Sequence, residues 1–237
     1  MIAVRRYLSS TIPCTLRHAT RVVRAAGRSE SHVPGRIYDR VPRDYGRDLL
    51  RFNRIPVRVT GLDGLQRLGP CVLASNHESW FDNPALVTTS PGWIRFLAKQ
   101  ELGKAPLFGG AMRAAGHITV NRRNPDSAHA AYDAAVRSLR GGISAVVFAE
   151  GTRTHDGKLR PFKEGPFVLA IMAQVPIVPV YVEGGYRVLR RGSLRPYPGA
   201  MTVHLGQPIS TAGLTCEDRD ALAARVRVAI IGLGARE

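Results

Sequence analysis

A histidine and an aspartate five residues apart form the pair with the clearest chemical potential in this chain. His77 and Asp82 lie in the polar segment that directly follows the apolar run Cys71–Ser75. Such a run is typical of a strand covered on both faces, and ligands of open α/β sheets bind beyond the carboxyl ends of strands. There a histidine can take a proton from a hydroxyl group, while the aspartate fixes its tautomer and stabilises the imidazolium. Taken alone, the spacing favours a simpler interpretation, a histidine that caps a loop.

Cations stand at the ends of other apolar runs. Arg122 ends the segment 116–122, Arg153 ends the segment 147–153, and Lys163 precedes Gly165, where a helix is predicted to begin. A helix N-terminus adds backbone donors and a dipole that favour an anion. We expect these groups to face one crevice with His77, an arrangement that suits reaction of a hydroxyl group on a phosphorylated molecule. For each arginine taken singly, a surface ion pair is the alternative.

The elements that must position these residues alternate between strand and helix from about Ile55 onward. The pattern predicts a layered α/β domain with a mixed, largely parallel sheet. The predicted strands are Val57–Thr60, Cys71–Ser75, Ile94–Ala98, His117–Val120, Ser144–Ala149, Ile177–Val182 and Met201–Leu205. The predicted helices are Asp126–Leu139, Gly165–Ala173 and Glu217–Ile231. Asp126 is expected to cap the first of these helices, and Gly141–Gly142 to end it.

The first 29 residues contain six arginines and no acidic residue. Apolar residues recur there at helical spacing, namely Val4, Leu8, Ile12, Leu16, Ala19, Val22 and Ala26. The pattern predicts a basic amphipathic helix, kinked or broken at Pro13, that can lie in a lipid headgroup region. Packing of the apolar stripe on the main domain and a role as a transit peptide remain as alternatives. After a polar connection over 30–42, a short helix is expected at Asp44–Phe52. We therefore divide the chain into an N-terminal helical segment, 1–54, and an α/β domain, 55–237.

The overall composition limits the function classes. The net charge of +16 favours an anionic partner, although only four of the 34 basic residues are lysines, so part of the arginine content can reflect genome composition. The apolar fraction of 44% argues against wholesale disorder. The three cysteines show no metal-ligand or redox spacing. No run approaches the length of about 18 apolar residues that a membrane span requires. Any membrane contact is therefore expected to be peripheral.

Four sequence blocks resemble those of the 1-acylglycerol-3-phosphate acyltransferases, also called lysophosphatidic acid acyltransferases. They are Asn76–Asp82, Gly116–Arg122, Phe148–Arg153 and Val175–Val180, in the order of the family. Lys99 and Glu101 match a further family segment, and the resemblance spans roughly 57–206. The chain departs from the family pattern at Glu78, Asn121 and Ala149. The carboxylate of Glu78 replaces a small polar residue beside the histidine.

The resemblance implies a direct attack without an acyl-enzyme, a bound cofactor or a metal. His77 would be the general base and Asp82 its partner. The acceptor phosphate and headgroup would be bound by Arg122, Glu150, Gly151, Thr152, Arg153 and Lys163. The acyl donor would be acyl-coenzyme A or acyl carrier protein. The strand 175–180 would shape the acyl-chain region or the core.

The expected function is transfer of an acyl chain to lysophosphatidate at the cytoplasmic face of a membrane, with an anionic lipid surface as partner. An acceptor of another kind, a different lysophospholipid or a lipid alcohol, is compatible with the same fold and chemistry. A basic module without catalysis, which binds membrane or nucleic acid, is the alternative from another class. It accounts for the charge but not for the ordered blocks, and no nucleic-acid-binding signature is present.

Overall fold

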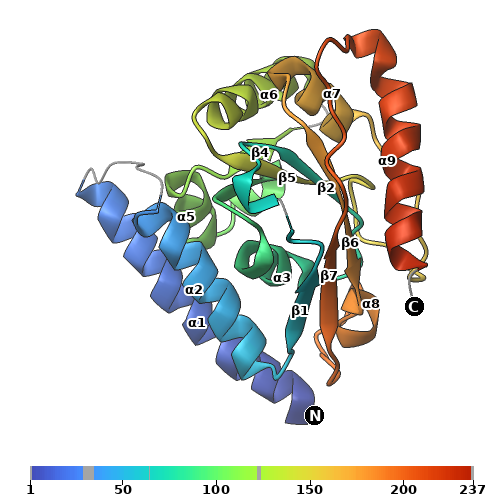
Figure 1. Cartoon of the computed structure of the whole chain (residues 1–237). Helices are drawn as coiled ribbons and strands as arrows, with labels where there is room; N and C mark the ends of the chain where they lie inside the picture. Colours follow the sequence, from blue (N-terminus) through green and yellow to red (C-terminus); the bar gives the residue numbers. More distant parts are fainter. Residues whose placement is uncertain (1, 29–34, 64, 122–123, 236–237) are drawn as a thin grey trace.

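A single sheet of seven strands forms the centre of the molecule (Figure 1). The computed structural model describes residues 2–28, 35–63, 65–121 and 124–235. The strands are β1 (Val57–Thr60), β2 (Val72–Ser75), β3 (Ile94–Lys99), β4 (Ile118–Val120), β5 (Ser144–Phe148), β6 (Ile177–Glu183) and β7 (Met201–Leu205). Their order is β1-β7-β6-β2-β5-β3-β4, and every pair is parallel except β6–β7. The predicted mixed, largely parallel sheet is confirmed.

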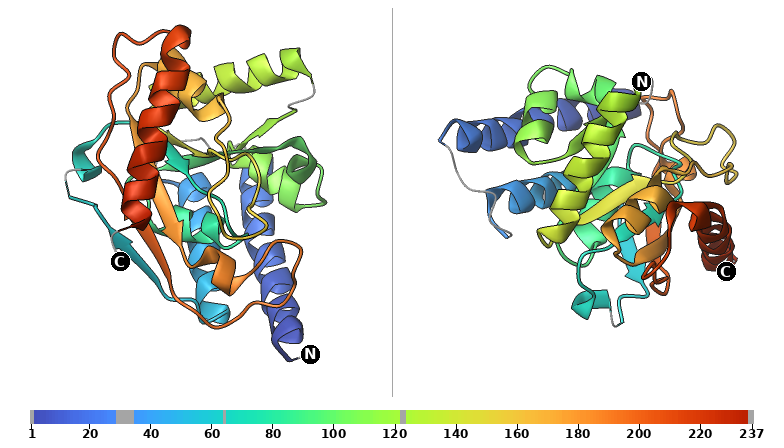
Figure 2. Two further views of the ribbon diagram at one scale, coloured as in Figure 1. Left: turned by 90° about the vertical axis from the view of Figure 1, so that its right-hand side faces the viewer. Right: turned by 90° about the horizontal axis from the view of Figure 1, so that it is seen from above.

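Helices cover both faces of the sheet, as a parallel sheet requires. One face packs against α3 (Asp82–Thr89) and residues of α1 (Ile2–Gly27) and α2 (Ile37–Phe52). The other face packs against α6 (Pro125–Arg140), α7 (Gly165–Ala173) and α9 (Arg219–Gly234). Figures 1 and 2 show α1 and α2 on the side of the sheet opposite α9. The short elements are α4 (Gln100–Gly103), α5 (Phe108–Ala114), α8 (Gly185–Val188) and two 3-10 turns, Leu65–Arg67 and Cys216–Asp218.

α1 continues through Pro13, so the helix is not broken there. α2 is longer than the sequence predicts: it begins at Ile37 and includes Pro42, so the predicted polar connection is wrong from residue 37 to residue 42. A proline inside a helix removes one hydrogen bond at a cost of about 3 kcal/mol. Here the two helices pack along each other, and α1 also packs on α5, which offsets that cost. The proposed division of the chain at residues 54 and 55 falls between α2 and β1.

The predicted apolar stripe of α1 is divided between two faces. Ala19 and Val22 are buried against α2 and α5, together with other small residues of the three helices. Leu8, Ile12 and Leu16 stay exposed, the latter two by about half of their surface (53% and 51%). One face of α1 therefore packs on the protein, and a second apolar face remains open to its surroundings. No helix in the described part of the chain is both long and apolar enough to span a bilayer.

The predicted elements of the α/β domain agree closely with the structure, although α9 begins two residues and ends three residues later than predicted. β1, β7 and α7 have the predicted bounds, and the other strands differ by one residue at an end. α6 ends before Gly141, as expected. Its cap is Asn124 rather than Asp126, because the Asn124 side chain accepts a hydrogen bond from the backbone N–H of Ser127 (3.2 Å). Pro125 then occupies the first turn, a position where a missing N–H costs nothing.

Candidate active site

The His77 imidazole and the Asp82 carboxylate form a direct hydrogen bond. The distance from His77 Nδ1 to Asp82 Oδ2 is 2.8 Å. Asp82 begins α3 and is fully buried, whereas 15% of the His77 side chain is exposed. An ionised carboxylate only accepts hydrogen bonds, so Nδ1 carries the proton and Nε2 is left with a free lone pair. This is the geometry of a base held by its orienting partner.

Asp82 is itself held by the loop that carries the histidine. Its Oδ2 also accepts hydrogen bonds from the backbone N–H groups of Glu78 (2.7 Å) and Ser79 (2.8 Å). Its Oδ1 has no hydrogen-bond partner among the described residues. Gly185 of α8 packs so closely that a Cβ there would lie 2.5 Å from Oδ1. The loop and α8 therefore fix the carboxylate in one orientation.

The sheet register brings a second carboxylate to the backbone of His77. Ser75 of β2 lies beside Phe148 of β5, so the residues two positions further along each strand, His77 and Glu150, are neighbours. Glu150 Oε1 accepts the His77 N–H (2.8 Å), and Oε2 accepts the Arg160 N–H (2.9 Å). Burial raises the pKa of Glu150. Both oxygens of this side chain are thus engaged with the backbone of the site.

The imidazole ring is also fixed from the side. The His77 ring stacks on the Phe148 ring with 3.6 Å between centroids and 12° between planes. Phe148 is the last residue of β5, the strand beside β2, so the stack follows from the same register. Stacking and the hydrogen bond to Asp82 restrict the ring to one plane and one rotamer, which is the preorganisation that proton transfer requires.

Glu78 lies on the inner side of the same loop. Its side chain is buried, and Oε2 accepts the backbone N–H of Tyr186 in α8 (2.9 Å). Burial raises the pKa of Glu78 to about 7, and the charges of Asp82 and Glu150 act in the same direction. The carboxylate that departs from the family pattern therefore points inward and not to solvent. It joins the histidine loop to α8.

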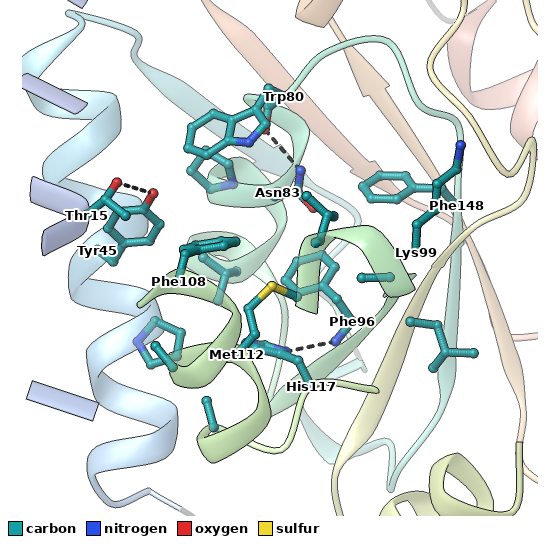
Figure 3. A pocket seen from close by; sticks show the side chains of 18 of the residues that line it. Thr15, Tyr45, Trp80, Asn83, Phe96, Lys99, Phe108, Met112, His117 and Phe148 are labelled. Atoms are coloured by element: carbon teal, nitrogen blue, oxygen red, sulfur yellow. Dashed lines mark hydrogen bonds between the residues drawn. The ribbon is translucent and has the colours of Figure 1, made fainter. Parts of the chain in front are cut away.

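A cavity of about 530 Å³ opens beside the His77 ring. Its walls are mostly apolar and come from α1, α2, α3, β3 and α5, with Val22, Val41, Val87, Leu97 and Met112 among the lining residues. Figure 3 shows Trp80 toward one end of this cavity and His117 toward the other. The volume lies within the range of roughly 300–1,000 Å³ that is usual for sites of small organic ligands. It is large enough for an extended apolar group.

His117 is one of the polar residues that line this cavity. Its Nδ1 accepts the Phe96 N–H (3.1 Å), so in the neutral ring the proton lies on Nε2 (Figure 3). Burial, together with the charge of Arg95, lowers the pKa of His117 to about 3. The ring is therefore uncharged at neutral pH and compatible with an apolar ligand.

Positive charge borders the same cavity. Arg153 follows β5, Lys99 ends β3, and Arg191 follows α8; all three line the cavity. Arg191 donates a hydrogen bond to the carbonyl of Arg153 (3.1 Å), which joins two of the three segments. An apolar chamber with a base and cations on its border is suited to a ligand that has a long apolar part and an anionic head.

The structure brings most of the predicted site residues together. Gly151, Thr152 and Arg153 line the cavity with His77, and Gly151 has the positive φ (+71°) that its tight turn requires. Lys163 is exposed and does not belong to the described lining of the cavity. The start of α7 at Gly165 packs against the Tyr132 hydroxyl, so the anion site expected at this helix end does not border the cavity.

Arg122 lies outside the described residues. Arg191 was not among the predicted site residues, although the run of arginines after residue 186 was a signal. The contribution of α1 and α2 was not predicted either, because no local pattern shows which helix closes a cavity. The proline-bracketed strand 175–180 overlaps β6, whose Ile177, Val178 and Val180 are buried in the core. Of its two predicted roles, the structure supports the core.

The fold and the site define a class of protein: a layered α/β domain with a histidine–aspartate pair beside an apolar, cation-bordered cavity. The family model described as Acyltransferase matches residues 56–183, more than half of the chain. The chain belongs to this acyltransferase family. The matched range contains the whole histidine loop, β5 and the turn that follows it.

Two curated relatives are similar in sequence to this chain, and one solved structure is similar in fold. It is 37% identical over 174 residues to the 1-acyl-sn-glycerol-3-phosphate acyltransferase alpha of Homo sapiens, a match that covers 73% of this chain and 62% of that protein. It is 34% identical to the beta form of Homo sapiens, with coverage of 90% and 72%. The chain thus spans about three fifths of the alpha relative. The fold matches that of the 1-acyl-sn-glycerophosphate (LPA) acyltransferase PlsC of Thermotoga maritima with a TM-score of 0.73 at 24% identity, over 98% of this chain and 99% of that one.

Proposed function

We propose that this protein transfers a fatty acyl chain from an acyl thioester to the free hydroxyl group of lysophosphatidate, which gives phosphatidate. One observation carries the proposal: the His77–Asp82 hydrogen bond of 2.8 Å lies beside an apolar cavity with cations on its border. The names of the matched relatives, which act on 1-acyl-sn-glycerol-3-phosphate, support the same acceptor.

In the proposed reaction, His77 Nε2 takes the proton of the acceptor hydroxyl as its oxygen attacks the thioester carbonyl carbon. The tetrahedral intermediate then collapses, the C–S bond breaks, and the departing thiolate takes the proton from the imidazolium. The carboxylate of Asp82 stabilises the imidazolium while it exists. Glu150 holds the His77 backbone, so we assign it a positioning role rather than direct contact with the acceptor. No acyl-enzyme forms in this sequence of steps.

We assign the acceptor phosphate to the cationic border of the cavity. Arg153 and the Gly151–Thr152 turn follow β5, the strand that pairs with the strand before the base, and Arg191 and Lys99 add charge from other elements. An arginine binds a phosphate through two parallel hydrogen bonds, which fixes the orientation of the acceptor as well as its charge. Arg122 and Lys163 remain proposed phosphate ligands on the family resemblance alone. The acyl chain would occupy the apolar part of the cavity, and the donor would be acyl-coenzyme A or acyl carrier protein.

We also propose peripheral docking on the cytoplasmic face of a membrane through the exposed face of α1. Leu8, Ile12 and Leu16 form an open apolar stripe on this helix, and Arg17 and Arg24 are exposed near it. Apolar side chains at the acyl boundary and arginines at lipid phosphates are the two contacts of an interfacial helix. The face of α1 with Thr15, Ala19 and Val22 lines the cavity. A helix on the lipid surface would therefore also be a wall of the chamber.

The base is tested with His77→Ala, with His155→Ala as a matched control because His155 is exposed and lies outside the cavity lining. The purified variants are assayed with a labelled acyl thioester and lysophosphatidate. Loss of a positioned general base lowers the rate by roughly 10²–10⁴-fold. We expect that loss in His77→Ala alone, with folding and liposome binding unchanged. Wild-type turnover in this variant would reject the mechanism.

The acceptor is tested with a panel at fixed donor: lysophosphatidate, a lysophospholipid with a choline headgroup, and a monoacylglycerol. We expect lysophosphatidate to be preferred, and Arg153→Gln to reduce that preference while leaving the monoacylglycerol rate nearly unchanged. Equal rates with all three acceptors would overturn the proposed substrate but keep the acyltransferase. No turnover with any of them would favour the module without catalysis.

Membrane docking is tested with the double variant Ile12→Ser/Leu16→Ser in liposome flotation. The control is Val228→Ser on α9, which removes a similarly exposed apolar side chain (70%) from the opposite side of the sheet. Burying one aliphatic side chain contributes roughly 1.5–3 kcal/mol. We therefore expect the double variant to bind anionic liposomes at least about tenfold more weakly, and the control to bind as the wild type does. Equal binding by all three proteins would refute docking through α1.

A further inference from the structure

Three metal-ligating side chains meet where α1 contacts α2. They are the Cys14 thiol and the His18 imidazole of α1 and the Asp48 carboxylate of α2. One ligand atom from each lies within 4.8 Å of the other two, and His18 Nε2 is 2.9 Å from Asp48 Oδ2. We propose that these residues form a binding site for Zn²⁺ that fastens α1 to α2. His18 also lines the cavity beside His77, but none of the three residues has a chemical step in the proposed acyl transfer.

The geometry needs only small adjustments to hold the ion. Cys14 and His18 are four residues apart, so both side chains lie on one face of α1, toward α2. With Zn–S near 2.3 Å and Zn–N or Zn–O near 2.0 Å, tetrahedral ligand atoms are roughly 3.3–3.6 Å apart. The His18–Asp48 contact is shorter than these values, and no pair of ligand atoms is more than 4.8 Å apart. Rotamer shifts of about an ångström would complete three positions of a tetrahedron, with the fourth left to water.

The chemistry of the three ligands selects the metal. A thiolate with an imidazole binds Zn²⁺ in preference to Mg²⁺ or Ca²⁺, because these two ions take oxygen ligands. A Cys14 thiolate and the Asp48 carboxylate together carry two negative charges, so a divalent ion makes the site neutral. This matters because Cys14 and His18 are almost fully buried (4% and 3% exposed), and a buried net charge is costly.

The Cys14 thiol gives metal binding a measurable signature, the release of a proton. An ordinary cysteine thiol has a pKa of about 8.5, so the metal-free thiol keeps its proton at neutral pH. Zn²⁺ binds the thiolate, and the proton of Cys14 must therefore leave to solvent when the ion binds. Binding then releases about one proton per ion, which a nonspecific carboxylate site would not do.

The surroundings are compatible with the neutral imidazole that a metal needs. Arg21 approaches His18 Nδ1 at 3.5 Å, the limit of a hydrogen bond. Its side chain is 45% exposed and also pairs with Asp44 (3.6 Å), so it can turn away and leave Nδ1 to carry the proton. Beside the site, the hydroxyl groups of Thr15 and Tyr45 join α1 and α2 a second time (2.9 Å; Figure 3). The ion would extend a contact that already exists between these helices.

The test uses the full-length protein without a histidine tag, prepared free of metal, and no substrate. Zn²⁺ is titrated by calorimetry in two buffers of different ionisation enthalpy, and Co²⁺ is used as a spectroscopic probe. We expect one ion per chain, release of about one proton, a thiolate-to-metal absorption band with Co²⁺, and a higher melting temperature with Zn²⁺. The site is overturned if the wild-type protein binds no Zn²⁺, or binds it without proton release.

Variants identify the ligands. Cys14→Ser and Asp48→Asn should each weaken Zn²⁺ binding by about 100-fold or more, since loss of a second-shell partner alone costs roughly 10–100-fold. Cys216→Ser is the matched control, because Cys216 is exposed and far along the chain, and it should bind as the wild type does. Unchanged binding in both ligand variants would refute the site, whatever their melting temperatures. His77→Ala should keep full Zn²⁺ binding, so failure of this proposal is distinguishable from failure of the proposed function.

Discussion

Replacing Glu78 with glutamine should make the protein more stable at alkaline pH and leave it unchanged at acidic pH. The carboxyl group is buried between the histidine loop and α8, and its pKa is raised from 4.5 to about 7, chiefly by burial. A group with a folded-state pKa above its unfolded value stabilises the protein fully below the unfolded value, and this contribution is lost as the pH rises through the folded value. The loss for Glu78 therefore develops between about pH 4.5 and pH 7.

The magnitude follows from the same two pKa values. Each tenfold change in proton affinity corresponds to about 1.4 kcal/mol, so ionising Glu78 in the folded state costs roughly 3 kcal/mol relative to a neutral side chain. Glutamine is neutral at every pH and keeps an oxygen for the Tyr186 N–H. For a chain of 237 residues, 1 kcal/mol shifts the melting temperature by roughly 2–4 °C. We expect Glu78→Gln to melt roughly 6–12 °C above the wild type at pH 8.

The assay is thermal unfolding followed by circular dichroism at half-unit steps from pH 4 to pH 8. The quantity of interest is the difference in melting temperature between variant and wild type, because the titrations of other groups cancel in it. Glu217→Gln is the control, since Glu217 is exposed and its difference should stay flat. A Glu78→Gln difference that does not change with pH, or that falls as the pH rises, would refute the reasoning.

Two further predictions test the packing around the site. Gly185→Ala places a Cβ about 2.5 Å from Asp82 Oδ1, so we expect acyl transfer to fall at least tenfold. Gly232→Ala in α9 should be neutral, because a Cβ there meets nothing within 4 Å. Equal activity of the two variants would contradict the close packing. Asp39→Asn removes the charged partner of the buried Arg95 guanidinium (2.5 Å), so the free energy of unfolding in urea should fall by about 3–5 kcal/mol. A fall of less than about 1 kcal/mol would show that the stability of the protein does not depend on this ion pair.

The sequence was sufficient to predict the sheet and the centre of the site. Strands such as β2 and β5 are mostly apolar, and polar residues of the site follow each of them within two positions, so the position of the strands and their chemistry are both local properties of the chain. The pairing of His77 with Asp82 was predictable for the same reason, since the two residues share one loop. The neighbouring position of Glu150 depends on the register of β2 with β5, which the sequence alone does not determine.

The N-terminal region was harder to predict because its structure depends on distant contacts. The proline in α1 is a local signal for a break, yet packing on α2 and α5 keeps the helix continuous. The apolar residues of α1 lie on two faces: Ala19 and Val22 on a packed face, Ile12 and Leu16 on an exposed one. The spacing of apolar residues in the sequence does not show which of them are packed. Lys163 is a similar case. Its position before a helix was correctly predicted, but the direction of that helix relative to the cavity could be seen only in the structure.

The position of α1 has a consequence for how a lipid would travel. Moving one methylene group from a membrane into water costs about 0.8 kcal/mol, so an acyl chain of about fifteen such groups would face a barrier of roughly 12 kcal/mol if it crossed water to reach the base. α1 exposes Ile12 and Leu16 on one face and lines the cavity with Ala19 and Val22 on another. If α1 docks on a membrane as proposed, one face of the helix would meet the bilayer and another the cavity, so the acyl chain could pass between them along α1. The rate of substrate exchange would then depend on how the acyl chain partitions between bilayer and cavity along α1, and not on the solubility of the lipid in water.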